Sequence, residues 1–164
     1  MKYILQTVLA FGLLYSCHPD KNRDIIRLAT EFTVNTLDSA KVYTDSSGIV
    51  TVGDFRARYV INFLQIFRGR IEEYSEKSVW VTIDSLHDPY LVPLYHLILS
   101  EEQGKLTILD TIRSDIRVLK LSNGIITADI PTHLPESPLY YCEECRDTVE
   151  YRVSGGKLIR VFPK

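Results

Sequence analysis

The segment "DIRVLKLSNGIITADI", residues 115–130, decides the fold class of this chain. Two runs rich in Val, Ile and Leu flank the dipeptide Asn123-Gly124. The favoured two-residue turn of a β-hairpin needs positive φ at both central residues, and Asn-Gly meets that requirement well. We therefore expect an antiparallel hairpin over residues 115–130.

The segments on both sides of this hairpin repeat the same organisation, in which polar turn residues separate apolar runs. Further hairpins are expected over residues 94–112, 41–54 and 147–162, with turns at Glu101–Gly104, Ser46–Gly48 and Ser154–Gly156. A composition with 10 Tyr and 6 Phe, together with many Val, Ile and Thr, also favours strands. Successive hairpins predict an antiparallel meander.

One amphipathic helix is expected before the strands, over residues 22–40, "NRDIIRLATEFTVNTLDSA". Ile25, Leu28, Ala29 and Phe32 follow the i, i+3, i+4, i+7 spacing of a single helical face. Asn22 or Asp24 is the expected N-cap, and the helix should end near residue 38. The predicted fold class is therefore mainly β (α+β), a single domain over residues 24–164 with one N-terminal helix.

Two segments are harder to interpret. Residues 55–71, "FRARYVINFLQIFRGRI", fit both a helix and a strand. Their aromatic and β-branched residues favour a strand bent near Phe63, with Tyr59, Ile61 and Phe67 on one face. Residues 78–86, "SVWVTIDSL", form a clear strand, and Pro89 and Pro93 are expected to interrupt the sheet because proline cannot serve in a central ladder.

The N-terminal segment has the pattern of an export signal. Lys2 precedes an apolar run, Tyr3–Leu14, that is about half of the ~20 residues needed to cross a membrane but suits a signal peptide. At the end of this run, the sequence Leu14-Tyr15-Ser16-Cys17 resembles the lipobox of bacterial lipoproteins, although Tyr15 is larger than usual. The resemblance implies cleavage after residue 16 and acylation of the Cys17 thiol and amine. Residues 1–16 are then a signal peptide and residues 17–23 a lipidated cysteine with a polar tether. Ordinary secretion, with Cys17 free or in a disulfide, is the alternative.

The Cys142-Glu143-Glu144-Cys145 sequence is the one chemically suggestive motif after the N-terminal segment. In an exported protein a local disulfide between Cys142 and Cys145 is the leading interpretation. Zinc is a second interpretation, with His133 and nearby carboxylates as further ligands, but a structural zinc site needs about four ligands. Thiol redox chemistry is a third, although the two glutamates disfavour a thiolate. Two inert thiols are a fourth.

No other residues form a convincing catalytic set. The histidines His18, His87, His96 and His133 have no partners at metal-ligand or triad spacing, so we expect them to be solvated or structural, and any of them to titrate near neutrality. Asp84 and Asp88 flank a loop beside Glu101 and Glu102 across a presumed hairpin. General acid–base catalysis needs carboxylates a few ångströms apart, which sequence alone does not establish, and carboxylates in loops are mostly solvated. The chain has 19 basic and 21 acidic residues, so it has no excess of positive charge that would attract nucleic acid.

Residues 95–138 and 142–161 resemble a family of small exported bacterial lipoproteins. Leu109-Asp110-Thr111-Ile112 takes the place of an "LGDR" segment, without its glycine. Asn123-Gly124-Ile125-Ile126 matches a hairpin of the family, and the cysteine pair follows a Pro-rich loop. The resemblance implies a β-rich exported lipoprotein and no particular activity.

Together these features predict a non-enzymatic, membrane-anchored lipoprotein of the bacterial cell envelope, with a binding or structural role and no cofactor. His18 rather than Asp after Cys17 favours the outer membrane. The expected partners are the membrane, through the lipid, and an envelope protein or glycan. The alternative is a metal-binding or thiol-redox module at Cys142 and Cys145, with zinc as its cofactor.

Overall fold

Ten strands in two antiparallel sheets and one helix make up the described part of the chain in the computed structural model. The structure describes residues 19–36, 41–46, 49–53, 58–71, 74, 77–87, 90–133, 137, 142 and 144–162. The helix is α2 (Pro19–Thr36). The strands of the first sheet are β1 (Lys41–Thr44), β2 (Val50–Gly53), β3 (Arg58–Gly69), β4 (Ser78–His87), β5 (Tyr90–Glu102) and β6 (Lys105–Arg113). The strands of the second sheet are β7 (Arg117–Ser122), β8 (Ile125–Pro131), β9 (Arg146–Ser154) and β10 (Lys157–Val161).

The predicted meander of hairpins is confirmed in both sheets. The first sheet has the strand order β1-β2-β3-β4-β5-β6 and the second the order β10-β9-β8-β7, so neighbours in sequence are neighbours in space. Three of the predicted turns lie where the sequence places them, and the two central residues of each have positive φ. These pairs are Gln103-Gly104 (51° and 78°), Asn123-Gly124 (52° and 78°) and Gly155-Gly156 (54° and 67°). Residues 47 and 48 of the expected Ser46–Gly48 turn lie outside the described part of the chain.

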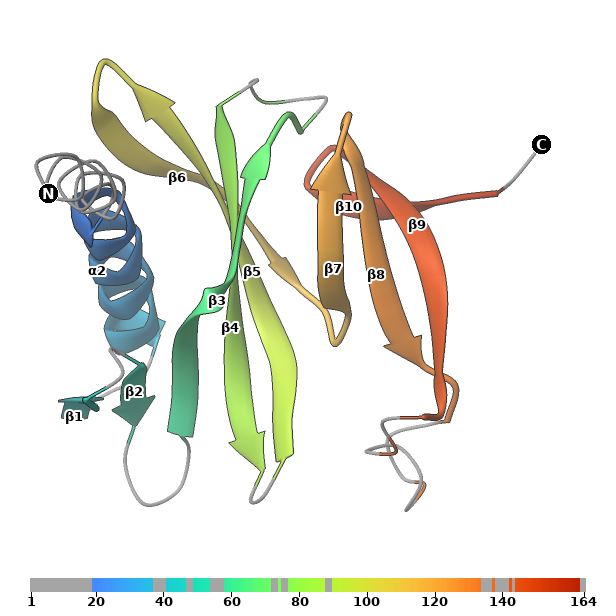
Figure 1. Ribbon diagram of the computed structural model, residues 1–164, viewed down its shortest axis with the longest axis horizontal. Coiled ribbons are helices and arrows are strands. Elements are labelled where there is room, and N and C mark those ends of the chain that lie inside the picture. Colours follow the sequence, from blue (N-terminus) through green and yellow to red (C-terminus); the bar gives the residue numbers. More distant parts are fainter. Residues whose placement is uncertain are drawn as a thin grey trace, which may run out of the picture.

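The molecule has three layers, with α2 on one face of the first sheet and the second sheet on the other (Figure 1). Side chains of β4 alternate between the two faces. Val79 and Val81 join the helix-side core, whereas Trp80 joins the inter-sheet core. The helix-side core consists of Ile25, Ala29, Val50, Val52, Ile61, Val79, Val81, Ile83, Leu97 and Leu99. The inter-sheet core consists of Ile71, Trp80, Ile98, Ile112, Ile116, Val118, Ile126, Ala128 and Val153. Burial on both faces explains why β4 is a nearly continuous apolar run.

The helix begins earlier than the sequence indicates. It starts at Pro19, so neither Asn22 nor Asp24 is its N-cap, and residues 19–23 of the expected tether are helical. Proline suits the start of a helix because its φ is already helical and its missing N–H would have no helical partner. The predicted apolar face is confirmed at Ile25 and Ala29, which are fully buried against the sheet. Among the described residues, no helix is long and apolar enough to cross a membrane.

The ambiguous segment is a strand, as favoured, but its predicted single face is wrong. The pairing of β3 with β4 shifts register between Ile61 and Ile66. Tyr59 and Ile61 pack with the helix-side core, whereas Phe67 packs with the inter-sheet core. Between these two pairs β3 advances five residues and β4 advances two, so β3 holds three extra residues. An odd number of extra residues reverses the alternation of side chains beyond it. Residues 55 and 57 and the side chain of Phe63 lie outside the described part.

The expectation that Pro93 interrupts the sheet is also wrong, because Pro93 lies within β5 and is paired with Asp84 of β4. The pairing of β5 with β6 begins only at Tyr95, opposite Arg113. At Pro93 the strand therefore has a partner on one side only, where a missing N–H costs no ladder hydrogen bond. Pro89 lies outside the described residues.

Candidate functional site

A cavity of about 170 Å³ opens between α2 and the first sheet. We call it the α2 pocket. Its apolar floor is formed by Ile25 of α2, Val79 of β4 and Leu106 of β6. Ile25 and Val79 are 1% and 4% exposed, so the floor is part of the packed core. The described residues that line it are Asp24, Ile25, Arg68, Val79, Glu101, Gly104 and Leu106.

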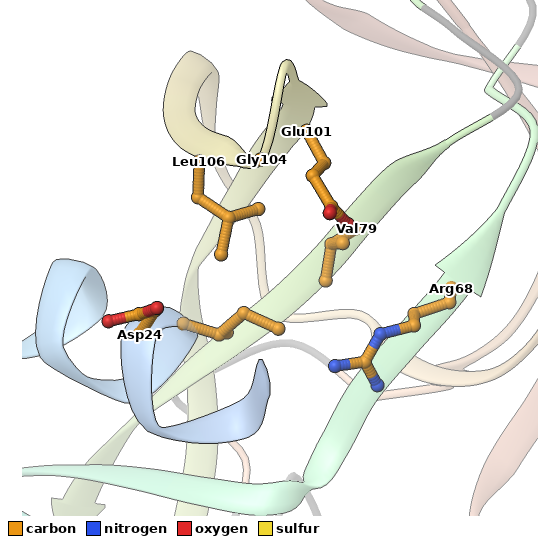
Figure 2. Close-up of a pocket in the computed structure, with 7 residues that line it drawn as sticks. Asp24, Arg68, Val79, Glu101, Gly104 and Leu106 are labelled. Atoms are coloured by element: carbon orange, nitrogen blue, oxygen red, sulfur yellow. The ribbon is translucent and has the colours of Figure 1, made fainter. Parts of the chain in front are cut away.

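Charged side chains from three elements form the rim of the pocket. Figure 2 shows Arg68 reaching from β3 toward α2 and Glu101 pointing from β5 toward the space beside Val79. The Arg68 guanidinium donates a hydrogen bond of 2.6 Å to Asn22 Oδ1 on α2. Asp24 completes the rim, and its carboxylate lies 3.7 Å from Arg27 Nε on the exposed side of the helix.

The local fold explains how these residues come together. Glu101 is placed opposite Leu106 by the antiparallel pairing of β5 and β6, which the tight Gln103-Gly104 turn joins. Arg68 lies beyond the register shift of β3, opposite Val79 of β4. Among the described lining residues there is no His, Cys, Ser or Thr. The charged rim and the apolar floor are groups that can bind a small ligand reversibly by charge and apolar contact.

Cys142 and Cys145 form a disulfide, with their Cα atoms 5.1 Å apart. The pair stands at the start of β9 and is fixed to the end of β8. The N–H and the hydroxyl of Thr132 both donate to the Cys145 carbonyl, at 3.0 and 2.9 Å, and the Cys145 N–H donates to the Cys142 carbonyl at 3.2 Å. Zinc binds thiolates, so the metal interpretation requires the reduced pair.

The structure brings no metal-binding group together within the residues that it describes: no three His, Cys, Asp or Glu side chains are placed to hold a metal ion. His133 is half-buried just beyond β8, and Glu143 lies outside the described part. Cys17, His18 and the predicted signal peptide also lie outside it, as does Asp88.

Two of the polar residues singled out in the sequence are buried. His96 has the structural role of the two expected, because it is fully buried, with Nδ1 3.2 Å from Thr82 Oγ1 and Nε2 3.1 Å from the Ser114 carbonyl. A carbonyl only accepts, so Nε2–H donates to Ser114 and Nδ1 accepts from the Thr82 hydroxyl, which fixes the neutral tautomer. Burial lowers the pKa of His96 to about 4, so it does not titrate near neutrality.

Asp84 does not lie beside Glu101. Asp84 pairs with Pro93 near one end of β5, whereas Glu101 lies at the other end, opposite Leu106. Asp84 is 5% exposed. Burial raises the pKa of its carboxyl to about 6, and the positive charge of Arg117 acts in the opposite direction.

Sequence reasoning did not find the α2 pocket. Asp24 stood out as a helix cap and Glu101 as a turn residue, and Arg68 belonged to the ambiguous segment. The one sequence signal for the site is a polar residue on each of three elements next to a buried apolar neighbour, a pattern that many surface residues share.

No protein family model matches this chain, and no curated protein or solved structure matches it.

Proposed function

We propose that this chain is a lipid-anchored binding protein of the bacterial cell envelope, without enzymatic activity. In this proposal Cys17 carries the lipid, and the α2 pocket takes up a small ligand at the membrane surface. The observation that carries the binding role is the pocket itself, which joins an apolar floor to oppositely charged rim residues. The lipobox-like Leu14–Cys17 sequence supports the anchor.

The start of the helix supports a site close to the membrane. α2 begins at Pro19, two residues after Cys17 in the sequence, and Asp24 of the pocket lies in its second turn. Five helical residues rise by about 8 Å, and two extended residues add at most about 7 Å. A lipid on Cys17 would thus hold the pocket within roughly 15 Å of the anchor.

The position of the helix also supports one orientation of the anchored protein. α2 and the second sheet lie toward opposite ends of the long axis of the molecule (Figure 1). In the anchored protein the second sheet then faces away from the lipid and is the surface open to an envelope protein or glycan. The absence of Asp after Cys17 favours the outer membrane as the site of anchorage.

A fractionation experiment tests the anchor. The full chain and its Cys17→Ser variant are produced in a Gram-negative bacterium, and the membranes are washed at high pH and pelleted. We expect the wild-type chain in the pellet and the Cys17→Ser variant in the supernatant, because one cysteine carries the whole membrane affinity. The matched control is the double variant Cys142→Ser, Cys145→Ser, which removes the other two sulfurs and should pellet like the wild type. Equal pelleting of Cys17→Ser and wild type contradicts the proposal.

A further inference from the structure

Opposite charges line the α2 pocket without forming an ion pair with each other. Within the described part of the chain, the Glu101 carboxylate has no hydrogen-bond or ion-pair partner. Among the described residues, the Arg68 guanidinium donates one hydrogen bond, to the neutral Asn22, and forms no ion pair. The two charges are therefore more than 4.0 Å apart while lining the same cavity.

A separation of this kind suits a ligand that carries both charges itself. The ammonium of such a ligand donates to Glu101, its carboxylate accepts from Arg68, and each charge-assisted hydrogen bond occupies ~2.8 Å. Two protein groups that pair with adjacent ligand charges must stand farther apart than an ion pair. Asp24 adds a second carboxylate on the side of α2, so the ammonium has negative charge on two sides.

The size and floor of the pocket select the rest of the ligand. A cavity of about 150 Å³ lined by apolar side chains admits a molecule the size of benzene, and this cavity has about 170 Å³. Ile25, Val79 and Leu106 present aliphatic surface to it, which matches a branched aliphatic side chain of four or so carbon atoms.

We propose that the α2 pocket binds a free aliphatic α-amino acid of the leucine type. Arg68 binds its carboxylate, Glu101 binds its ammonium, and the floor of Ile25, Val79 and Leu106 receives its side chain (Figure 2). This inference rests on the proposed binding function and names its ligand class. Because the rim is partly exposed and the ligand small, the affinity belongs in the micromolar to low millimolar range.

The test is isothermal titration calorimetry of the full chain, kept in detergent micelles, with L-leucine. Three analogues each remove one feature of the ligand: 4-methylpentanoic acid lacks the ammonium, leucinamide lacks the carboxylate and glycine lacks the side chain. We expect each analogue to bind at least about tenfold more weakly than leucine, since a hydrogen bond to a charged group contributes roughly a tenfold to hundredfold change in affinity. Leucinamide or 4-methylpentanoic acid binding as tightly as leucine overturns the assignment.

Variants of the chain give the second arm. Glu101→Gln and Arg68→Gln should each weaken leucine binding at least about tenfold. Their matched controls are Glu102→Gln and Arg70→Gln, exposed neighbours outside the lining, which should change the affinity less than about twofold. Circular dichroism spectra confirm that all four variants are folded. No heat of binding at about 10 mM leucine, or equal binding by all four variants, contradicts the proposal.

The calorimetry and the fractionation test separate claims, so a negative result in one leaves the other claim standing. Leucine binding by a chain whose membrane attachment does not depend on Cys17 removes the anchor and keeps the ligand. Attachment through Cys17 without leucine binding keeps the anchor and removes this ligand.

Discussion

At the scale of single residues, two buried ionisable groups bear on the stability of the fold in opposite ways. Burial raises the pKa of Asp84 to about 6 and lowers that of His96 to about 4. A raised carboxyl pKa means that the folded chain binds more protons than the unfolded chain. The contribution of Asp84 to stability is therefore fully present below about pH 4 and is lost as the pH rises through 6. The contribution of His96 is present above about pH 6.5 and is lost as the pH falls toward 4.

Variants of the two residues should therefore change the pH dependence of the free energy of unfolding in opposite directions. Between pH 4 and 6.5, the free energy of unfolding of Asp84→Asn should rise relative to the wild type, by up to about 3 kcal/mol, because one pKa unit corresponds to about 1.4 kcal/mol. The free energy of unfolding of His96→Gln should fall relative to that of the wild type by a similar amount over the same pH range. Urea titrations at four pH values between 4 and 7 measure both differences. Differences that stay constant with pH contradict the burial of these charges.

Neither residue was recognisable from its local sequence. His96 stands in an apolar run, where alternation could put it on the polar face of a strand. Asp84 stands between a run of strand formers and a proline-containing loop, where carboxylates are mostly solvated. Their burial follows from the second sheet, which covers that side of β4 and β5. Sequence patterns report which face is apolar but not whether a polar position will be covered by a distant element.

At the scale of elements, the hairpin turns were predictable because each turn depends on two or three adjacent residues. The register shift in β3 and the pairing of Pro93 were not, because they depend on the neighbouring strand. The turn between β9 and β10 adds a contact that crosses from one sheet to the other. Gly156 lies against the Asp110 carboxylate of β6, which Tyr74 also contacts by donating a hydrogen bond of 2.7 Å.

Two alanine substitutions in this turn measure that contact. Both Gly155 and Gly156 have positive φ, so alanine costs roughly 1–2 kcal/mol at either position. A Cβ at position 155 meets open space, whereas one at position 156 collides with Asp110 Oδ2. Tyr74 and the Thr111 N–H hold the two oxygens of Asp110, so the carboxylate cannot easily move aside. We expect Gly156→Ala to lower the free energy of unfolding by at least about 1 kcal/mol more than Gly155→Ala does. Equal losses in denaturant titrations contradict the contact.

At the scale of the whole molecule, the fold class and the strand order followed from the sequence, but the division into two sheets did not. Ser114, Asp115 and Ile116 join β6 to β7 without a proline or glycine to mark the change. The link is fixed by tertiary contacts: the Ser114 carbonyl accepts from His96, and the Ser114 N–H donates to the Leu94 carbonyl at 3.1 Å. The α2 pocket depends on the same layering, since its lining comes from α2, β3, β4 and the β5–β6 hairpin.

The central claim is that this three-layered domain works at a lipid surface, attached through one sulfur. Intact-mass spectrometry of the chain extracted from membranes tests it most directly. The result that we predict is a mature chain whose first residue is Cys17, heavier than its amino acids by acyl groups on the thiol and the new amine. A chain that retains residues 1–16, or one that begins at Cys17 with an unmodified thiol, contradicts the claim.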